Sequence, residues 1–145
     1  MTSSIREGEL EFDFGTEEIE KLDQVGREMP IGMSFVDIVV FRQNETILIE
    51  VKDPSQTGTP PNEQGVFLKS LSKKTLINEK LVPKARDSYT FLHLMKRIKG
   101  NIVFVVLFGF DKCGFTLAPA LILTFRDRLK ARLLKEHTSL GRLNT

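Results

Sequence analysis

Two runs rich in β-branched and aromatic residues, 34–41 and 47–52, lie on either side of a short polar segment. Such runs predict two antiparallel strands joined by a hairpin turn. Away from their charged ends, both runs are apolar on both faces, which is typical of strands in the centre of a sheet. The chain is therefore expected to fold around a central hairpin.

Three ionisable residues, Asp37, Glu50 and Lys52, gather at one end of this hairpin. Successive side chains of a strand point to opposite faces, so Glu50 and Lys52 share a face. A two-residue turn at Gln43-Asn44 sets Asp37 opposite Glu50, whereas a turn at Asn44-Glu45 sets it opposite Lys52. Either register brings the three side chains to one face. A three-residue loop would break this arrangement, because a slip of one residue flips the faces.

Two carboxylates on adjacent strands repel each other unless a positive charge compensates them. Mg²⁺ or Mn²⁺ would do so, because both ions favour carboxylate and water oxygens and Mg²⁺ often adds substrate phosphate. A neighbouring lysine can orient a water or stabilise charge that develops on a phosphate. The set therefore suits metal-assisted hydrolysis of phosphodiesters. The alternative is an ordinary hairpin whose charges lie on a solvated face.

Asp37, the spacer 38–49 and then Glu50-Val51-Lys52 resemble the motif of the PD-(D/E)xK nuclease superfamily, with Val36 where the namesake proline would stand. The resemblance implies a restriction-endonuclease-like fold, which is an α/β mixed sheet flanked by helices with an αβββαβ core. It also implies that Asp37, Glu50 and the Val51 carbonyl hold the metal, and that Lys52 is the catalytic lysine.

An acidic segment before the hairpin, 16–25, predicts a helix, with Thr16 as its N-cap and glutamates in its first turn. On this helix Glu18 falls within the apolar arc, whereas Glu17 and Glu20 fall outside it. Many members of the resembled family carry a helical glutamate that reaches the metal, so Glu18 is expected as a further ligand. The alternative is a glutamate that caps the helix at the margin of the core.

The rest of the chain predicts an α/β order. Pro83 predicts the start of a helix over 84–99, and the apolar run 101–110 predicts a central strand. The third strand of the core is expected from 10–14 or from within 65–82. The remaining expectations are a loop over 53–64, an edge strand over 115–124 interrupted at Pro119, and an amphipathic helix over 125–136. We expect one domain over 1–137 and a mobile tail over 138–145.

Charge is distributed unevenly along the chain. Residues 1–65 hold five basic and fourteen acidic residues, a net charge of −9, and 66–145 hold sixteen and five, a net charge of +11. The basic half suggests contact with a nucleic-acid backbone. Self-association of an acidic and a basic face would produce the same asymmetry. The cationic side chains predicted to contact DNA are Lys73, Lys74, Lys84 and Arg86.

Several classes of protein are disfavoured. The single Cys113 excludes an internal disulfide and fits a reducing cytosol, and two histidines with one cysteine leave no credible zinc site. The run 102–110 is too short to span a bilayer. We therefore expect a cytoplasmic, Mg²⁺- or Mn²⁺-dependent endonuclease that acts on DNA and does not associate with a membrane. A homodimer or a partner subunit could use the apolar residues of 115–134.

Two other functions fit the same pattern. The fold could serve as a non-catalytic module for nucleic-acid binding or protein assembly. The chain could also be a plain α/β interaction domain in which the motif arose by chance. Binding of Mn²⁺ at Asp37 and Glu50 separates the nuclease from the plain interaction domain.

Overall fold

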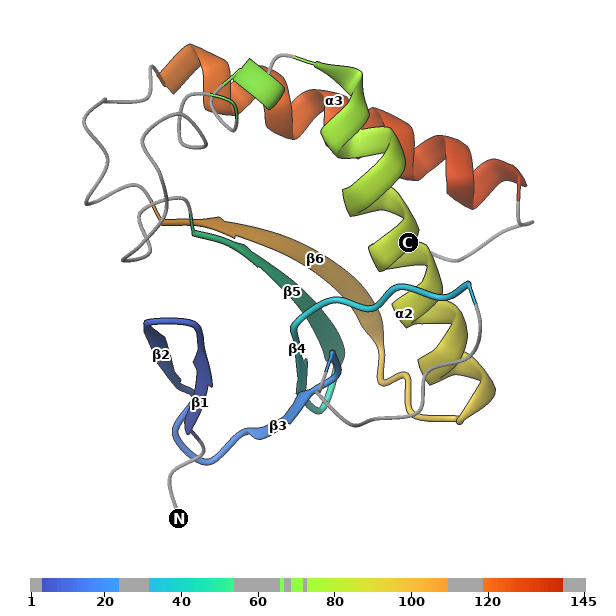
Figure 1. Cartoon of the computed structure of the whole chain (residues 1–145). Coiled ribbons are helices and arrows are strands. Elements are labelled where there is room, and N and C mark those ends of the chain that lie inside the picture. Colours follow the sequence, from blue (N-terminus) through green and yellow to red (C-terminus); the bar gives the residue numbers. More distant parts are fainter. Residues whose placement is uncertain are drawn as a thin grey trace. The chain divides into compact units, whose positions relative to one another are not determined.

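The computed structural model describes residues 4–23, 32–53, 66, 69–71, 73–109 and 119–139 (Figure 1). These residues fall into two compact units. The first unit comprises the described residues within 1–52 and 84–107, and the second comprises those within 53–83 and 108–144. Among the described helices, none is both long and apolar enough to cross a membrane.

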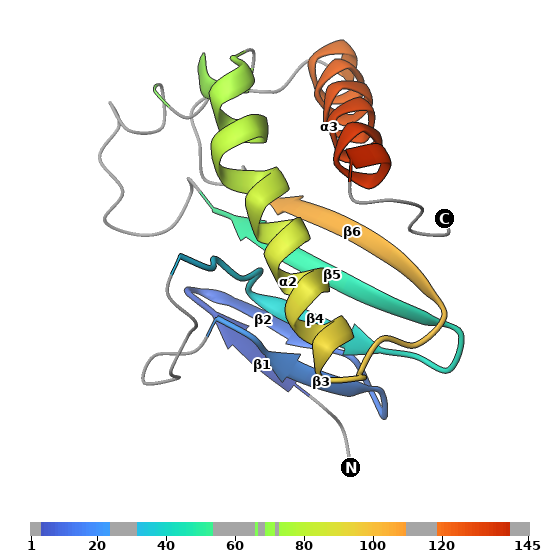
Figure 2. The same cartoon turned by 90° about the vertical axis from the view of Figure 1, so that its right-hand side faces the viewer.

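The first unit is built on a four-stranded mixed sheet. Its strands, in spatial order, are β3 (Glu18–Lys21), β4 (Ile38–Phe41), β5 (Glu45–Lys52) and β6 (Asn101–Phe108). Pairing is antiparallel from β3 to β4 and from β4 to β5. β6 runs parallel to β5 (Figure 2), and its first residue, Asn101, donates its N–H to the carbonyl of Asn44 at 3.0 Å. The α/β class with a mixed sheet is thus confirmed.

The predicted hairpin is strands β4 and β5, and all four residues of β4 are buried. Ile38 pairs with Ile49, and Phe41 pairs with Thr46. Beyond this last pair, the N–H of Arg42 donates to the carbonyl of Glu45 at 2.9 Å. The turn is therefore Gln43-Asn44, which is the first of the two registers that the sequence allowed.

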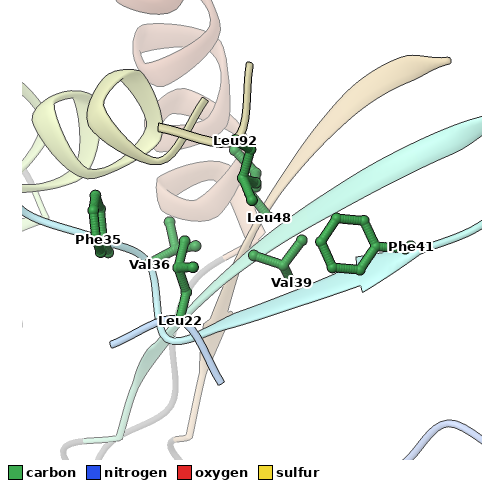
Figure 3. Close-up of a cluster of buried hydrophobic side chains, with 7 residues drawn as sticks. All are labelled: Leu22, Phe35, Val36, Val39, Phe41, Leu48 and Leu92. Atoms are coloured by element: carbon green, nitrogen blue, oxygen red, sulfur yellow. The ribbon is translucent and has the colours of Figure 1, made fainter. Parts of the chain in front are cut away.

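The two faces of the sheet pack against different elements. One face forms a core with α2 (Val82–Leu94), and Figure 3 shows its buried residues, which are Leu22, Phe35, Val36, Val39, Phe41, Leu48 and Leu92. The other face packs against the hairpin of β1 (Ser4–Glu7) and β2 (Leu10–Asp13), through Ile5 and Phe12 (Figure 2). The sheet is therefore a middle layer, and its α2 face is the one that Asp37, Val39 and Leu48 share.

The helix predicted over 16–25 is wrong, because 18–21 form strand β3. A turn precedes it, in which Gly15 takes a positive φ of 63° and donates its N–H to Asp13 Oδ1 at 2.8 Å. Pairing with β4 and the partial burial of Ile19 against the cluster of Ile38, Val40 and Ile49 outweigh the weak helix propensity of this acidic segment. The strand that pairs with the other edge of β4 is thus β3. Leu10–Asp13 form β2 of a separate two-stranded sheet, and the described residues within 65–82 form no strand.

The helix predicted over 84–99 begins earlier in the chain. The π-helix η1 (Leu76–Leu81) leads directly into α2, and the N–H of Val82 donates to the carbonyl of Ile77. Pro83 has no N–H, and its ring would clash with a carbonyl in a regular α-helix, so a wider turn just before it relieves that conflict.

This helix also ends earlier than predicted, at Leu94. Lys96 takes a positive φ of 58°, and the N–H of Arg97 donates to the carbonyl of Leu92 at 2.8 Å. A residue in the left-handed conformation, followed by such a hydrogen bond back to the last turn, ends a helix. Lys96 thus occupies the C-terminal position that is more often taken by glycine.

The second unit contains η1 and α3 (Pro119–Ser139), which contact each other. Phe125 and Leu129 of α3 are buried, and Phe125 meets Phe108 edge to face at 5.5 Å between ring centroids. The predicted strand 115–124 is wrong from Pro119 onward, because proline is well tolerated in the first turn of a helix. Residues 115–118, and the predicted loop from 54 onward, lie outside the described residues. α3 continues to Ser139, into the segment expected to be a tail, and 140–145 also lie outside.

Candidate metal centre

Two buried carboxylates meet where β4 begins and β5 ends. Asp37 comes directly before β4, and the register of the hairpin sets it opposite Glu50 on the face that α2 covers. Asp37 is 7% exposed and Glu50 is 1% exposed. Acidic side chains are rarely buried without a compensating charge, so this pair marks the site that most needs an explanation.

Backbone hydrogen bonds fix the position of Asp37. Its Oδ2 accepts the N–H of Val51 at 2.8 Å, and its own carbonyl accepts the N–H of Leu22 at 3.0 Å. The predicted metal ligand Val51 thus contacts Asp37 through its N–H. Its carbonyl as a ligand stays a prediction.

Helix α2 holds the segment that leads into Asp37. The N–H of Ser34 donates to Asp87 Oδ2 at 3.0 Å, and the N–H of Val36 donates to Ser88 Oγ at 2.9 Å. Ser88 is fully buried and Asp87 nearly so. We did not predict these two positioning residues. The sequence does contain a signal for Asp87 and Ser88. Together with Lys84 they are spaced so that three polar residues lie on one face of a helix that packs against a core.

Two lysines contact the same oxygen of Glu50. Lys84 Nζ of α2 lies 2.6 Å from Glu50 Oε1, and Lys52 Nζ lies 3.2 Å from it. The structure thus brings the three motif residues together, as the hairpin predicted. It adds Lys84, which the sequence suggested only as a contact for DNA. The resulting cluster is two acids and two bases on one face of the sheet.

The charges in this cluster shift each other's protonation. Burial raises the pKa of Glu50 above its usual range, and the charge of Asp37 adds to the effect, while Lys84 and Lys52 oppose it. Burial alone would lower the pKa of Lys84, but its hydrogen bond to Glu50 and the nearby carboxylates outweigh burial and raise it. The negative charge of Glu50 therefore stabilises the positively charged form of Lys84.

A pH dependence of stability follows from Glu50. Its pKa in the folded protein lies above the ordinary value of 4.5, so the folded protein holds this proton more tightly than the unfolded chain. The free energy of unfolding should therefore fall as the pH rises from about 4.5 through the raised pKa. Urea unfolding at a series of pH values, with a chelator present, should show a larger fall in the wild type than in Glu50→Gln. Parallel curves for the two proteins would contradict the raised pKa.

The donor chemistry of the cluster fits Mg²⁺ or Mn²⁺. Glu50 Oε2 is buried and has no hydrogen-bond partner, and Asp37 supplies a second carboxylate. Among the described residues, no group of three or more His, Cys, Asp or Glu could hold a metal ion. Two carboxylates nevertheless suffice for Mg²⁺, which usually keeps several waters and takes further oxygens from substrate phosphates.

Glu18 does not join this cluster. It pairs with Phe41, so it lies toward the opposite end of β4 from Asp37, and its side chain is 60% exposed. Its carboxylate lies 3.5 Å from Lys99 Nζ and 3.9 Å from a guanidinium nitrogen of Arg97. The prediction of a helical glutamate beside the metal is wrong, because the segment is a strand and points this side chain elsewhere.

The other predicted DNA contacts lie in different surroundings. Arg86 Nε donates to Asp87 Oδ1 at 3.0 Å, on the same helix as Lys84. Lys73 and Lys74 are exposed and belong to the second unit. Contact of these residues with DNA stays a prediction.

Comparison with known proteins finds no relative of this chain. No protein-family model, no curated protein and no solved structure matches the chain. The resemblance to the PD-(D/E)xK superfamily therefore rests on the sequence of the hairpin and stays a prediction.

Proposed function

We propose that the chain is a metal-dependent nuclease of PD-(D/E)xK type that hydrolyses phosphodiester bonds of DNA. The observation that carries the proposal is the pair of buried, opposed carboxylates of Asp37 and Glu50, with Lys52 on the same face. The order β3-β4-β5-α2-β6 also agrees with the last five elements of an αβββαβ core, which supports a restriction-endonuclease-like fold.

In this proposal each residue of the cluster has a separate task. Asp37 and Glu50 would hold Mg²⁺ or Mn²⁺, with the Val51 carbonyl as a further ligand. When bound, the metal would polarise the scissile phosphate and lower the pKa of a water. Lys52 orients that water and stabilises the charge that develops on the phosphate. The N–H of Val51 keeps Asp37 in place while this happens.

Lys84 acts on the resting site. At 2.6 Å from Glu50 Oε1, its ammonium compensates the carboxylate when no metal is bound. A metal ion therefore competes with Lys84 for Glu50. Once displaced, the lysine is close enough to the site to contact the phosphate of the substrate, which is the role that the sequence suggested for it.

One observation favours the second candidate, a non-catalytic module of the same fold. Glu50 already has two lysines within 3.2 Å, so its charge is compensated without a metal. In such a module the cluster would only stabilise the hairpin against α2. This candidate predicts no metal binding at Asp37 and Glu50.

Calorimetric titration with Mn²⁺ tests the proposal. The wild type and Glu45→Gln should bind the ion, whereas Glu50→Gln should not, because it lacks a charged ligand. Glu45 is a matched control, since it lies on the same strand and pairs with Arg42 at the surface. Thermal melting of each variant checks that it folds.

Cleavage of branched, linear and single-stranded DNA by the wild type, with Mn²⁺ or with a chelator, completes the test. Metal-dependent cleavage of any of these substrates supports the nuclease. Metal binding without cleavage of any of them would point to a missing partner subunit or to a different substrate. Equal Mn²⁺ binding by Glu50→Gln and the wild type would refute the site.

A further inference from the structure

A basic pocket of about 270 Å³ lies within the second unit, between η1 and α3. Lys74 and Asn78 line it from the side of η1. From α3 it is lined by Arg128, Arg132 and Lys135. Among the described residues that line the pocket, none is acidic. Four positively charged side chains around one hollow favour the binding of an anion.

The spacing of the charges on α3 suits an extended anion rather than a single phosphate. Arg128, Arg132 and Lys135 are four and then three residues apart, so they lie on one face of the helix. At a rise of 1.5 Å per residue, their backbones span roughly 10 Å along the axis. One strand of duplex DNA carries a phosphate about every 3.4 Å along its axis, so this row extends over roughly three phosphates.

The elements that carry these charges are anchored by apolar contacts. Phe125 and Leu129 bury one side of α3, and Leu76 and Ile77 are buried on η1. The cationic groups therefore extend from helices that are held in place, which lowers the entropy lost on binding. Guanidinium groups also bind phosphate oxygens through two parallel hydrogen bonds, and lysine adds a point charge.

We propose that this pocket binds the phosphate backbone of a nucleic acid, without reading its sequence. The inference goes beyond the proposed cleavage site, because its residues belong to the other unit and need neither a metal nor catalysis. Lys74 was predicted as a DNA contact from the sequence. The structure adds Asn78 and the row on α3, which together make that lysine part of a defined site.

Fluorescence anisotropy of a short labelled DNA duplex, measured in a chelator at several salt concentrations, tests the proposal. The pocket variant carries Arg128→Gln with Lys135→Gln. The control carries Arg126→Gln with Lys130→Gln, which removes the same two charge types from roughly the opposite side of α3 at about 100° per residue. Arg126 and Lys130 are exposed, and both double variants should melt close to the wild type.

The slope of log affinity against log salt is the decisive readout. Each phosphate contact contributes about 0.9 to this slope for duplex DNA, so the pocket variant should lose about 1.8 relative to the wild type. The slope of the control should differ from the wild-type slope by less than about 0.9, which is the contribution of one phosphate contact. Equal changes in both variants would show that only net charge matters and would overturn the proposal, as would a wild type that does not bind DNA.

A second measurement separates the nucleic-acid backbone from a small anion. Inorganic phosphate is added to the complex while chloride is reduced to keep the ionic strength constant. Duplex binding should be unchanged, because several contacts along a strand outcompete one phosphate. Displacement of the duplex at constant ionic strength would identify a small-anion site and overturn the proposal. Since the chelator prevents metal-dependent cleavage, neither result depends on the proposed nuclease activity.

Discussion

Asp37→Asn should slow metal-dependent DNA cleavage by about a thousandfold or more. A bound metal stabilises the transition state by several kcal/mol, and each 1.4 kcal/mol corresponds to about a factor of ten in rate. The variant should still fold, because the oxygen of the amide can accept the N–H of Val51 as Asp37 Oδ2 does at 2.8 Å. Its stability should equal or exceed that of the wild type, since the repulsion between Asp37 and Glu50 is removed.

The measurement is the single-turnover cleavage rate with saturating DNA, together with urea unfolding of both proteins. Asp127→Asn makes the same chemical change at a side chain that is 68% exposed, and it should leave both quantities unchanged. If Asp37→Asn cleaved DNA at the wild-type rate, Asp37 would not be a metal ligand. A large loss of stability would instead show that the carboxylate is chiefly structural.

Lys84→Met should lower the free energy of unfolding by about 3 kcal/mol when a chelator is present. Removing one partner of a buried ion pair costs roughly this much, because the other charge stays buried without compensation. The remaining contact of Lys52 with Glu50, at 3.2 Å, keeps the loss at the lower end of the range. Mn²⁺ should restore much of the loss, and the variant should bind the ion more tightly than the wild type, since no lysine competes for Glu50.

Urea unfolding with and without Mn²⁺ checks both parts of this expectation. Lys99→Met is the matched control, because Lys99 is half exposed and its ion pair with Glu18 at 3.5 Å lies on the surface. Such pairs contribute at most about 1 kcal/mol, and the control should bind Mn²⁺ like the wild type. Loss of stability in Lys84→Met without rescue by Mn²⁺ would favour the non-catalytic module, in which the cluster only joins the hairpin to α2.

The central hairpin could be predicted because its signals are local. A run of β-branched residues, a polar turn and a second run lie within twenty residues or so, and side-chain alternation then fixes which residues share a face. The sequence left two registers open, since both turns are chemically reasonable. Only the pairing of Ile38 with Ile49 decides between them and sets Asp37 opposite Glu50.

The errors arose where distant contacts outweigh local preference. Residues 16–25 carry helix-favouring glutamates, yet β4 offers a free edge and β3 pairs with it, so Glu18 leaves the predicted position. The role of Lys84 was missed for a related reason. Glu50 lies thirty-four residues away in sequence, and no local pattern predicts that α2 would cross the sheet at that point.

The hydrogen bonds that the segment before Asp37 donates to side chains of α2 have a consequence for how the protein folds. Their partners are 53 and 52 residues apart in sequence, so a long loop must close before they form. Contacts of this separation slow folding, and they form only after the chain has been synthesised beyond Ser88. A nascent chain that has completed only the β4–β5 hairpin therefore has its two carboxylates opposite each other. It still lacks the support of α2 for the segment before Asp37 and the ion pair of Lys84 with Glu50.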